Sequence, residues 1–123
     1  MHALVIDDSR VARAVIRQIL TEMGIVVSEA GNGREALDLL QAIPDVELAL
    51  VDWNMPVMDG LEFITAVRSQ RAFDSVKIVM VTTETESEQV TRAMHAGANE
   101  YVMKPFTKDV LVAKLSMLDI FGE

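Results

Sequence analysis

The stretch LALVDWNMPVMDGLEF, residues 48–63, holds the pattern from which the whole fold is predicted. Leu48–Val51 is an apolar run without polar alternation, which is typical of a strand buried on both faces of a parallel sheet. The run stops on a carboxylate, Asp52, and a helix can begin a few residues later at Asp59, a favourable capping residue. The stretch therefore predicts one β-α unit with a charged residue at the end of its strand.

The same pattern recurs before and after this stretch. The other apolar runs are Ala3–Ile6, Ile25–Val27, Ile78–Val81 and Tyr101–Met103, the last of which is short enough to be a loop. Segments with helical spacing follow the runs: one with the stripe Val11, Val15, Ile16, Ile19, Leu20 and Met23, one over about 32–43, one from Asp59, one over about 86–96, and one from about Thr107 with Val110, Leu111, Leu115 and Leu118. Because crossovers between parallel strands are right-handed, this order predicts an α/β fold, a doubly wound five-stranded parallel sheet with helices on both faces.

Composition argues against several classes of protein. A chain of 123 residues suggests one domain, and a hydrophobic share of 50% argues against disorder. Eleven Lys and Arg against 19 Asp and Glu give a net charge of −8, which disfavours nucleic-acid binding. Without cysteine there is no disulfide, thiol catalysis or cysteine-ligated zinc. No apolar run approaches the ~20 residues of a membrane span and no basic leader precedes the first one, so we expect a cytoplasmic protein without membrane contact.

Polar side chains follow four of the predicted strands. Since parallel strands deliver their carboxyl ends to one edge of the sheet, where ligands bind, these side chains should gather there. Adjacent carboxylates repel each other, and Mg²⁺, which prefers oxygen ligands and often shares phosphate oxygens, would relieve that repulsion. A Thr hydroxyl and a Lys could hold phosphoryl oxygens, and one carboxylate could form an aspartyl phosphate, although spacing does not say which. The residues concerned are Asp7, Asp8, Asp52, Thr82, Thr83 and Lys104.

Several segments together resemble the receiver domain of two-component response regulators, and most closely the single-domain chemotaxis regulators of the CheY type. The matching segments are VIDDSR, VDWNMPVMDGLE, IVMVTTE and AGANEYVMKPF, in this order and at this spacing. One such segment alone would be a weak signal, whereas the ordered set is very specific. The resemblance covers essentially the whole chain and implies one receiver domain over residues 1–123. It also implies the flavodoxin-like (βα)5 receiver fold, with strand order 2-1-3-4-5.

The resemblance also implies roles for the acidic residues. Asp52 is similar to the phosphoacceptor. Asp7 and Asp8 are similar to the acidic pair that holds Mg²⁺, together with Asp52 and the backbone carbonyl of Asn54. Trp53, the only Trp, follows the acceptor and should report optically on metal binding beside it.

Further roles fall on the fourth and fifth strands. Thr82 resembles the switch hydroxyl at the catalytic site, and Lys104 the phosphate-binding lysine. Tyr101 resembles the switch aromatic, which becomes buried when Thr82 turns toward the phosphoryl group. Lys104 and Pro105 resemble a pair joined by a cis peptide, which is tolerated before proline.

Two neighbouring positions keep alternatives open. Thr83 is a rival hydroxyl to Thr82, and receivers often carry a smaller residue there. Glu84 and Asn54 flank the site and could tune the lifetime of the phosphoryl group, although for Glu84 a solvated loop charge is nearly as good an interpretation.

The implied function is a phosphorylation-driven switch rather than an enzyme acting on a separate substrate. A histidine kinase or phosphotransfer protein would supply the phosphoryl group, and the chain would catalyse its own Mg²⁺-dependent phosphorylation and could catalyse the reverse loss. The response would appear on the face of helix four, strand five and helix five, where a downstream target protein binds. Candidate output positions there are Val90, Met94, Tyr101 and Lys114.

Three other functions are weighed against this one. An Asp-nucleophile, Mg²⁺-dependent phosphatase of the haloacid-dehalogenase type would carry Asp-x-Asp at the nucleophile, where this chain has Asp52-Trp53-Asn54. A flavodoxin-like FMN carrier needs phosphate-binding donors in its first loop, where Asp7 and Asp8 would repel phosphate. A degenerate receiver would bind partners without phosphorylation, and the complete set of Asp, Thr and Lys residues argues against it.

Overall fold

The computed structural model describes residues 1–83 and 87–118 of the chain. One sheet of five parallel strands has the order β2-β1-β3-β4-β5, so the predicted doubly wound sheet and its strand order are confirmed. The short run at Tyr101 is a strand and not a loop. The strands are β1 (His2–Ile6), β2 (Val26–Ala30), β3 (Val46–Asp52), β4 (Lys77–Thr82) and β5 (Glu100–Met103).

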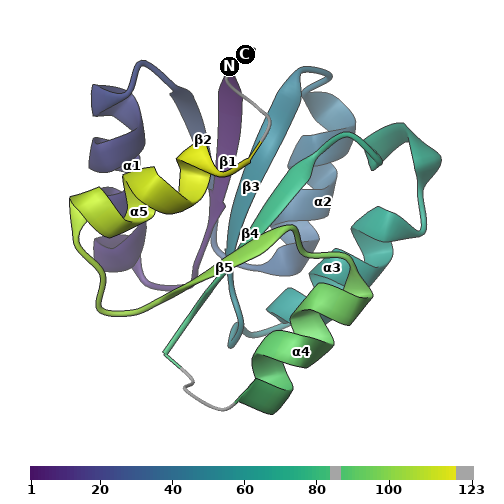
Figure 1. Cartoon of the computed structure of the whole chain (residues 1–123). Helices are drawn as coiled ribbons and strands as arrows, with labels where there is room; N and C mark the ends of the chain where they lie inside the picture. The colour runs from purple at the N-terminus through teal and green to yellow at the C-terminus, as the bar shows by residue number, and fades with distance from the viewer. Residues whose placement is uncertain (84–86, 119–123) are drawn as a thin grey trace.

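Helices cover both faces of the sheet. Figure 1 shows α1 and α5 on one face and α2, α3 and α4 on the other. Side-chain oxygens of Ser9, Asn32, Asp59 and Thr107 accept hydrogen bonds from the backbone N–H groups that begin α1, α2, α3 and α5. The predicted helix over about 86–96 is observed from Ser87, and Glu86 lies outside the described residues. The helices are α1 (Arg10–Glu22), α2 (Gly33–Ala42), α3 (Gly60–Arg68), the 3-10 turn η1 (Arg71–Phe73), α4 (Ser87–Ala96) and α5 (Lys108–Ser116).

The central strands divide the core into two apolar layers. Alternate residues of a strand point to opposite faces, so each central strand contributes side chains to both layers. One layer packs against α1 and α5 and includes Val5, Leu50, Val79, Leu20 and Leu111. The other packs against α2, α3 and α4 and includes Leu4, Val51, Met80, Leu37 and Phe63. This double burial explains why the central strands lack polar alternation.

Two expectations about burial are wrong. Strand β2 is an edge strand, and Val26 is 60% exposed, because it pairs only with β1. The apolar stripe of α1 is wider than the face that meets the sheet, so Val11 and Val15 remain exposed while Ile16 and Leu20 are buried. Val110 of α5 is exposed for the same reason.

The strand register brings the carboxyl ends of the strands to one level. Ile6 of β1 pairs with Val51 of β3. The next residue along each chain segment is an aspartate, so Asp7 and Asp52 lie side by side. Asp52 pairs with Val81, one residue before Thr82. Across the described part of the chain, no helix has the length and apolar character needed to span a bilayer.

Candidate functional site

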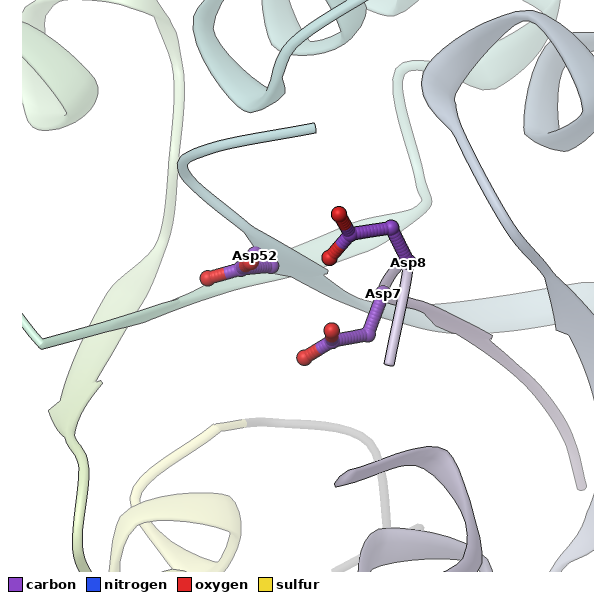
Figure 2. A group of neighbouring side chains, drawn as sticks. All are labelled: Asp7, Asp8 and Asp52. Atoms are coloured by element: carbon purple, nitrogen blue, oxygen red, sulfur yellow. The ribbon is translucent and has the colours of Figure 1, made fainter. Parts of the chain in front are cut away.

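Three carboxylates converge at the carboxyl edge of the sheet. Asp7 and Asp8 follow β1 and Asp52 ends β3, and Figure 2 shows the three side chains beside one another. One oxygen from each lies within 4.8 Å of the others. Asp7 is buried, Asp8 is exposed, and the Asp52 side chain is 13% exposed. The fold therefore brings Asp52 close in space to the adjacent pair Asp7 and Asp8, more than 40 residues earlier in the sequence.

Asp7 is the most firmly held of the three. Its Oδ1 accepts a hydrogen bond from the Ser9 backbone N–H at 2.9 Å, and its Oδ2 accepts one from Lys104 Nζ at 2.7 Å. Its own backbone N–H donates to the Ala30 carbonyl at 3.1 Å. These bonds fix Asp7 between the start of α1 and the end of β5.

Lys104 joins two of the carboxylates. Its Nζ lies 3.7 Å from Asp52 Oδ1, in addition to its bond with Asp7. Its backbone N–H donates to the Thr82 carbonyl at 2.7 Å, which extends the pairing between β4 and β5. The peptide between Lys104 and Pro105 is cis, as expected. The predicted phosphate-binding lysine thus carries its ammonium group into the acidic cluster.

The surroundings of Asp52 disfavour its charged form. Burial and the neighbouring Asp7 carboxylate together raise the pKa of Asp52 to about 6, although Lys104 partly offsets them. A cation placed among the three carboxylates would favour the charged form again. The donor set, three carboxylates and no nitrogen or sulfur ligand, suits a hard divalent cation such as Mg²⁺.

Asn54 lies in the loop that follows Asp52. With Asp8 and Asp59 it lines an open hollow of about 450 Å³ beside the acidic cluster, whose other lining residues are Met55 and Pro56. This position places Asn54 next to the acidic residue that is most accessible. Its expected backbone ligand role stays a prediction.

The two candidate hydroxyls differ sharply in burial. Thr82, the last residue of β4, is 2% exposed, whereas Thr83 is exposed and faces a hollow of about 400 Å³ lined by Lys104, Pro105 and Phe106 and by α1. Glu84 lies outside the described residues.

Tyr101 lies in β5 between the core and the surface. It is half-buried and packs against the α2–α3–α4 layer of the core. Lys114 Nζ of α5 lies 4.4 Å from the centre of its ring and 3.3 Å from Glu100 Oε1. Of the other output candidates, Met94 is exposed and Val90 is half-buried.

Sequence reasoning missed three residues that shape the site. Arg13 donates to the Asp7 backbone carbonyl, although in sequence it looks like an ordinary charge off the apolar stripe of α1. The Arg92 guanidinium of α4 lies 5.9 Å from the centre of the Trp53 ring. Gly60 presses against the end of β3, because a Cβ there would collide with the Asp52 carbonyl oxygen. The glycine in MDG was a signal for that close approach, and the two arginines had none.

Comparison with known proteins agrees with this geometry. The sequence model for the response regulator receiver domain matches residues 3–116. The chain belongs to that family. A chemotaxis protein CheY homolog of Campylobacter jejuni is 45% identical over 99% of this chain and 93% of its own length. Chemotaxis protein CheY1 of Helicobacter pylori is 42% identical over 96% of each chain.

The fold has equally similar solved structures. Chemotaxis protein CheY4 of Vibrio cholerae superposes with a TM-score of 0.88 and 36% identity, covering 94% of this chain and 96% of that one. The chain is accordingly a two-component response regulator of the CheY chemotaxis type, a signalling switch. The phosphatase and FMN-carrier alternatives gain no support from these matches.

Proposed function

We propose that this response regulator accepts a phosphoryl group on Asp52 and thereby changes its affinity for a target protein. One observation carries the proposal: Asp7, Asp8 and Asp52 offer oxygens within 4.8 Å of one another, with Lys104 Nζ in contact with two of them. This is a combination of nucleophile, cation ligands and phosphate-binding ammonium. The phosphodonor is a histidine kinase or phosphotransfer protein carrying phosphohistidine.

The reaction is a phosphoryl transfer between two side chains. An Asp52 carboxylate oxygen attacks phosphorus, and the new O–P bond forms as the P–N bond of phosphohistidine breaks. The bonding pair remains on the imidazole nitrogen, which takes a proton from solvent. We assign the role of nucleophile to Asp52 because its position is similar to that of the family's phosphoacceptor. Its side chain, at the end of β3, is 13% exposed, whereas Asp7 is buried and bonded.

The other site residues hold the transferred group. Asp7, Asp8, Asp52 and the Asn54 backbone carbonyl would hold Mg²⁺, which when bound offsets the negative charge of the carboxylates and phosphoryl oxygens. Lys104 Nζ lies 3.7 Å from Asp52 Oδ1 and would bind a phosphoryl oxygen carried by Asp52. The Thr82 hydroxyl bonds a second phosphoryl oxygen. In this way the chain supplies much of the catalysis of its own phosphorylation.

The switch then runs from Thr82 to the surface. As Thr82 turns toward the phosphoryl group, Tyr101 moves inward, and the face of α4, β5 and α5 favours its target-binding form. The residues that would contact the target belong to these three elements: Val90, Met94, Tyr101 and Lys114. We place this activity in the cytoplasm, in one receiver domain over residues 1–123, with neither nucleic acid nor membrane as partner.

Intact-mass measurement tests the proposal. The chain is incubated with Mg²⁺ and either acetyl phosphate or a phosphorylated histidine kinase, beside Asp52→Asn and an EDTA control. We expect a gain of one phosphoryl group that requires Mg²⁺ and disappears in Asp52→Asn. The same gain in Asp52→Asn would show that another residue is the acceptor. Steady turnover of small phosphate esters would instead favour the phosphatase alternative.

A further inference from the structure

Asp8 is the member of the acidic cluster that the structure holds least. Its side chain is exposed, and among the described residues no hydrogen bond or ion pair reaches its carboxylate. Asp7, by contrast, is bonded through both carboxylate oxygens. The direction of the Asp8 side chain therefore depends on the peptide group from which it projects.

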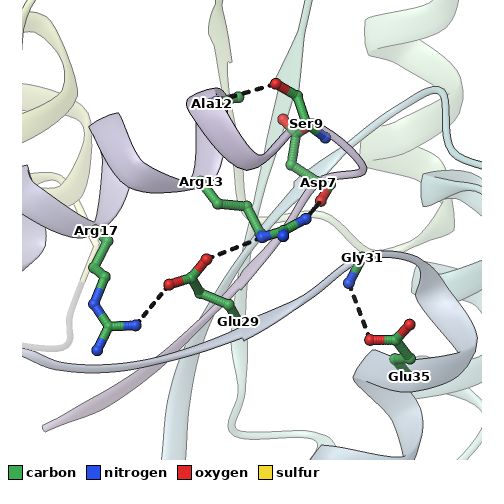
Figure 3. Close-up of polar contacts among 8 residues, drawn as sticks. All are labelled: Asp7, Ser9, Ala12, Arg13, Arg17, Glu29, Gly31 and Glu35. Atoms are coloured by element: carbon green, nitrogen blue, oxygen red, sulfur yellow. Dashed lines mark hydrogen bonds and ion pairs between the residues drawn. The ribbon is translucent and has the colours of Figure 1, made fainter.

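Arg13 holds that peptide group. Its Nη1 donates a hydrogen bond to the Asp7 backbone carbonyl, which belongs to the peptide between Asp7 and Asp8. Its Nε donates to Glu29 Oε1 on β2 at 2.9 Å, and Figure 3 shows both bonds leaving one guanidinium group. The Arg13 side chain is only 15% exposed. One planar group thus ties the loop after β1 to helix α1 and to the neighbouring strand.

Glu29 anchors this arrangement to the sheet. It lies on β2 opposite Val5 of β1, and its second oxygen accepts a bond from Arg17 Nη1 at 2.6 Å. The bond from Arg17 lowers the pKa of Glu29. Arg17 touches Glu29 but makes no bond to the Asp7 carbonyl.

We propose that Arg13 is a positioning residue for the Mg²⁺ site: by holding the peptide between Asp7 and Asp8 it keeps the Asp8 carboxylate facing Asp7 and Asp52. The inference rests on the proposed function, in which this cluster binds Mg²⁺. Three like charges repel one another, so a loop released by Arg13 would let the exposed Asp8 swing toward solvent. Groups that orient metal ligands have large effects on affinity for this reason.

Variants of Arg13 and Arg17 distinguish the effect of the Arg13 hydrogen bonds on Mg²⁺ affinity from the effect of its charge. Arg13→Gln removes both bonds, and Arg13→Lys keeps the charge, but a single ammonium group cannot reproduce the two directed bonds of a guanidinium. Arg17→Gln is the control, because it removes the same charge one helical turn later and also breaks a Glu29 bond. Isothermal titration with Mg²⁺ gives the dissociation constant of each. We expect the Mg²⁺ dissociation constant to be about tenfold larger in both Arg13 variants than in the wild type. In Arg17→Gln it should stay within about twofold of the wild-type value.

An Asp8→Asn background tests whether Arg13 acts through Asp8. There, adding Arg13→Gln should leave the Mg²⁺ dissociation constant unchanged, since no charged Asp8 remains to be positioned. An effect of Arg13→Gln that persists in this background would overturn the inference, as would equal losses in Arg13→Gln and Arg17→Gln.

Separate measurements test whether the variants fold and whether the wild-type chain binds Mg²⁺. Urea unfolding in EDTA and near-UV circular dichroism confirm a folded chain, and Arg13→Lys carries the test if Arg13→Gln does not fold. Wild-type Mg²⁺ binding with no loss in either Arg13 variant would overturn this inference alone. A wild-type chain that does not bind Mg²⁺ would overturn the proposed metal site, and this inference with it.

Discussion

At the scale of single residues, the Asp52 carboxylate lies where the fold makes its charged form unfavourable. Burial and the nearby Asp7 charge raise the pKa of Asp52 to about 6, against about 3.9 for a free Asp side chain. Lys104 offsets only part of this. The native fold therefore disfavours the charged form of Asp52 that the proposed reaction requires, and a cation bound at this point would favour that form again.

The raised pKa of Asp52 predicts that the difference in stability between Asp52→Asn and the wild type depends on pH. The folded chain holds the Asp52 proton more tightly than the unfolded chain does. The wild-type free energy of unfolding should therefore fall as pH rises from about 4 to about 6 and change little above that through this group. In EDTA, Asp52→Asn should be more stable than wild type by about 1–2 kcal/mol at pH 7.5 and nearly equal at pH 4.

Urea unfolding at both pH values measures this difference. Asp38→Asn is the matched control, because Asp38 is exposed on α2 and forms a surface ion pair with Arg34, its one ion pair among the described residues. We expect little effect from it at either pH. A stability gain in Asp52→Asn that is the same at pH 4 and pH 7.5 would contradict the link to Asp52 ionisation.

At the scale of secondary-structure elements, the site depends on how closely α3 approaches the end of β3. The Gly60 backbone N–H donates to the Trp53 carbonyl at 3.0 Å, and a Cβ on Gly60 would collide with the Asp52 carbonyl oxygen. Asp59 begins α3 with a capping box. Its side chain accepts a hydrogen bond from the Glu62 backbone N–H, and the Glu62 side chain accepts one from the Asp59 backbone N–H. The helix start therefore presses backbone against backbone directly behind Asp52.

A methyl group at position 60 should disturb both stability and the site. We expect Gly60→Ala to lower the free energy of unfolding by about 1–3 kcal/mol, because the colliding atom is backbone and cannot rotate away. Mg²⁺ affinity should fall as well, since relief of the collision moves Asp52. Urea unfolding and Mg²⁺ titration measure the two effects.

Gly31→Ala provides the comparison for this prediction. A Cβ on Gly31 would meet only the side-chain end of Glu35 at 3.6 Å and that of Arg13 at 3.8 Å, which are ordinary contacts. Its stability should stay within about 0.5 kcal/mol of wild type. If the two substitutions cost the same, the close approach of α3 to β3 would not be the cause.

At the scale of the whole molecule, the site joins elements from both layers of the core. Asp7, Asp52 and Lys104 belong to the ends of β1, β3 and β5, so the acidic cluster is complete only in the folded sheet. An ion that binds the cluster binds the native state and not the unfolded chain. Binding energy at the edge of the sheet is then added to the stability of the entire domain.

Mg²⁺ should therefore stabilise the chain against unfolding. At a concentration ten times its dissociation constant, Mg²⁺ should add about 1.4 kcal/mol to the free energy of unfolding. Asp8→Asn should gain clearly less at the same concentration because it lacks one carboxylate ligand. Urea unfolding with and without Mg²⁺ measures the gain, and NaCl of equal ionic strength corrects for screening of the net charge of −8. An equal gain from NaCl would contradict specific binding.

Much of this architecture was predictable because it is local. Apolar runs without alternation marked the strands buried on both faces, and Asp59 and Thr107 marked two helix starts. Strand ends placed Asp7, Asp8, Asp52 and Lys104 at one edge. Exposure was less predictable, as Val15 and Val26 show: each lies in an apolar pattern, but neighbouring elements cover only part of it.

The sequence by itself determined the order of elements, the parallel sheet, the family and the identity of the acidic cluster. All of these follow from periodicity and from motifs within short segments. Only the tertiary structure decided which groups shift the pKa of Asp52, that Lys104 bonds Asp7, and that Arg13 holds the peptide before Asp8. Those contacts join residues from different strands and helices, and their distances arise from packing that no single segment encodes.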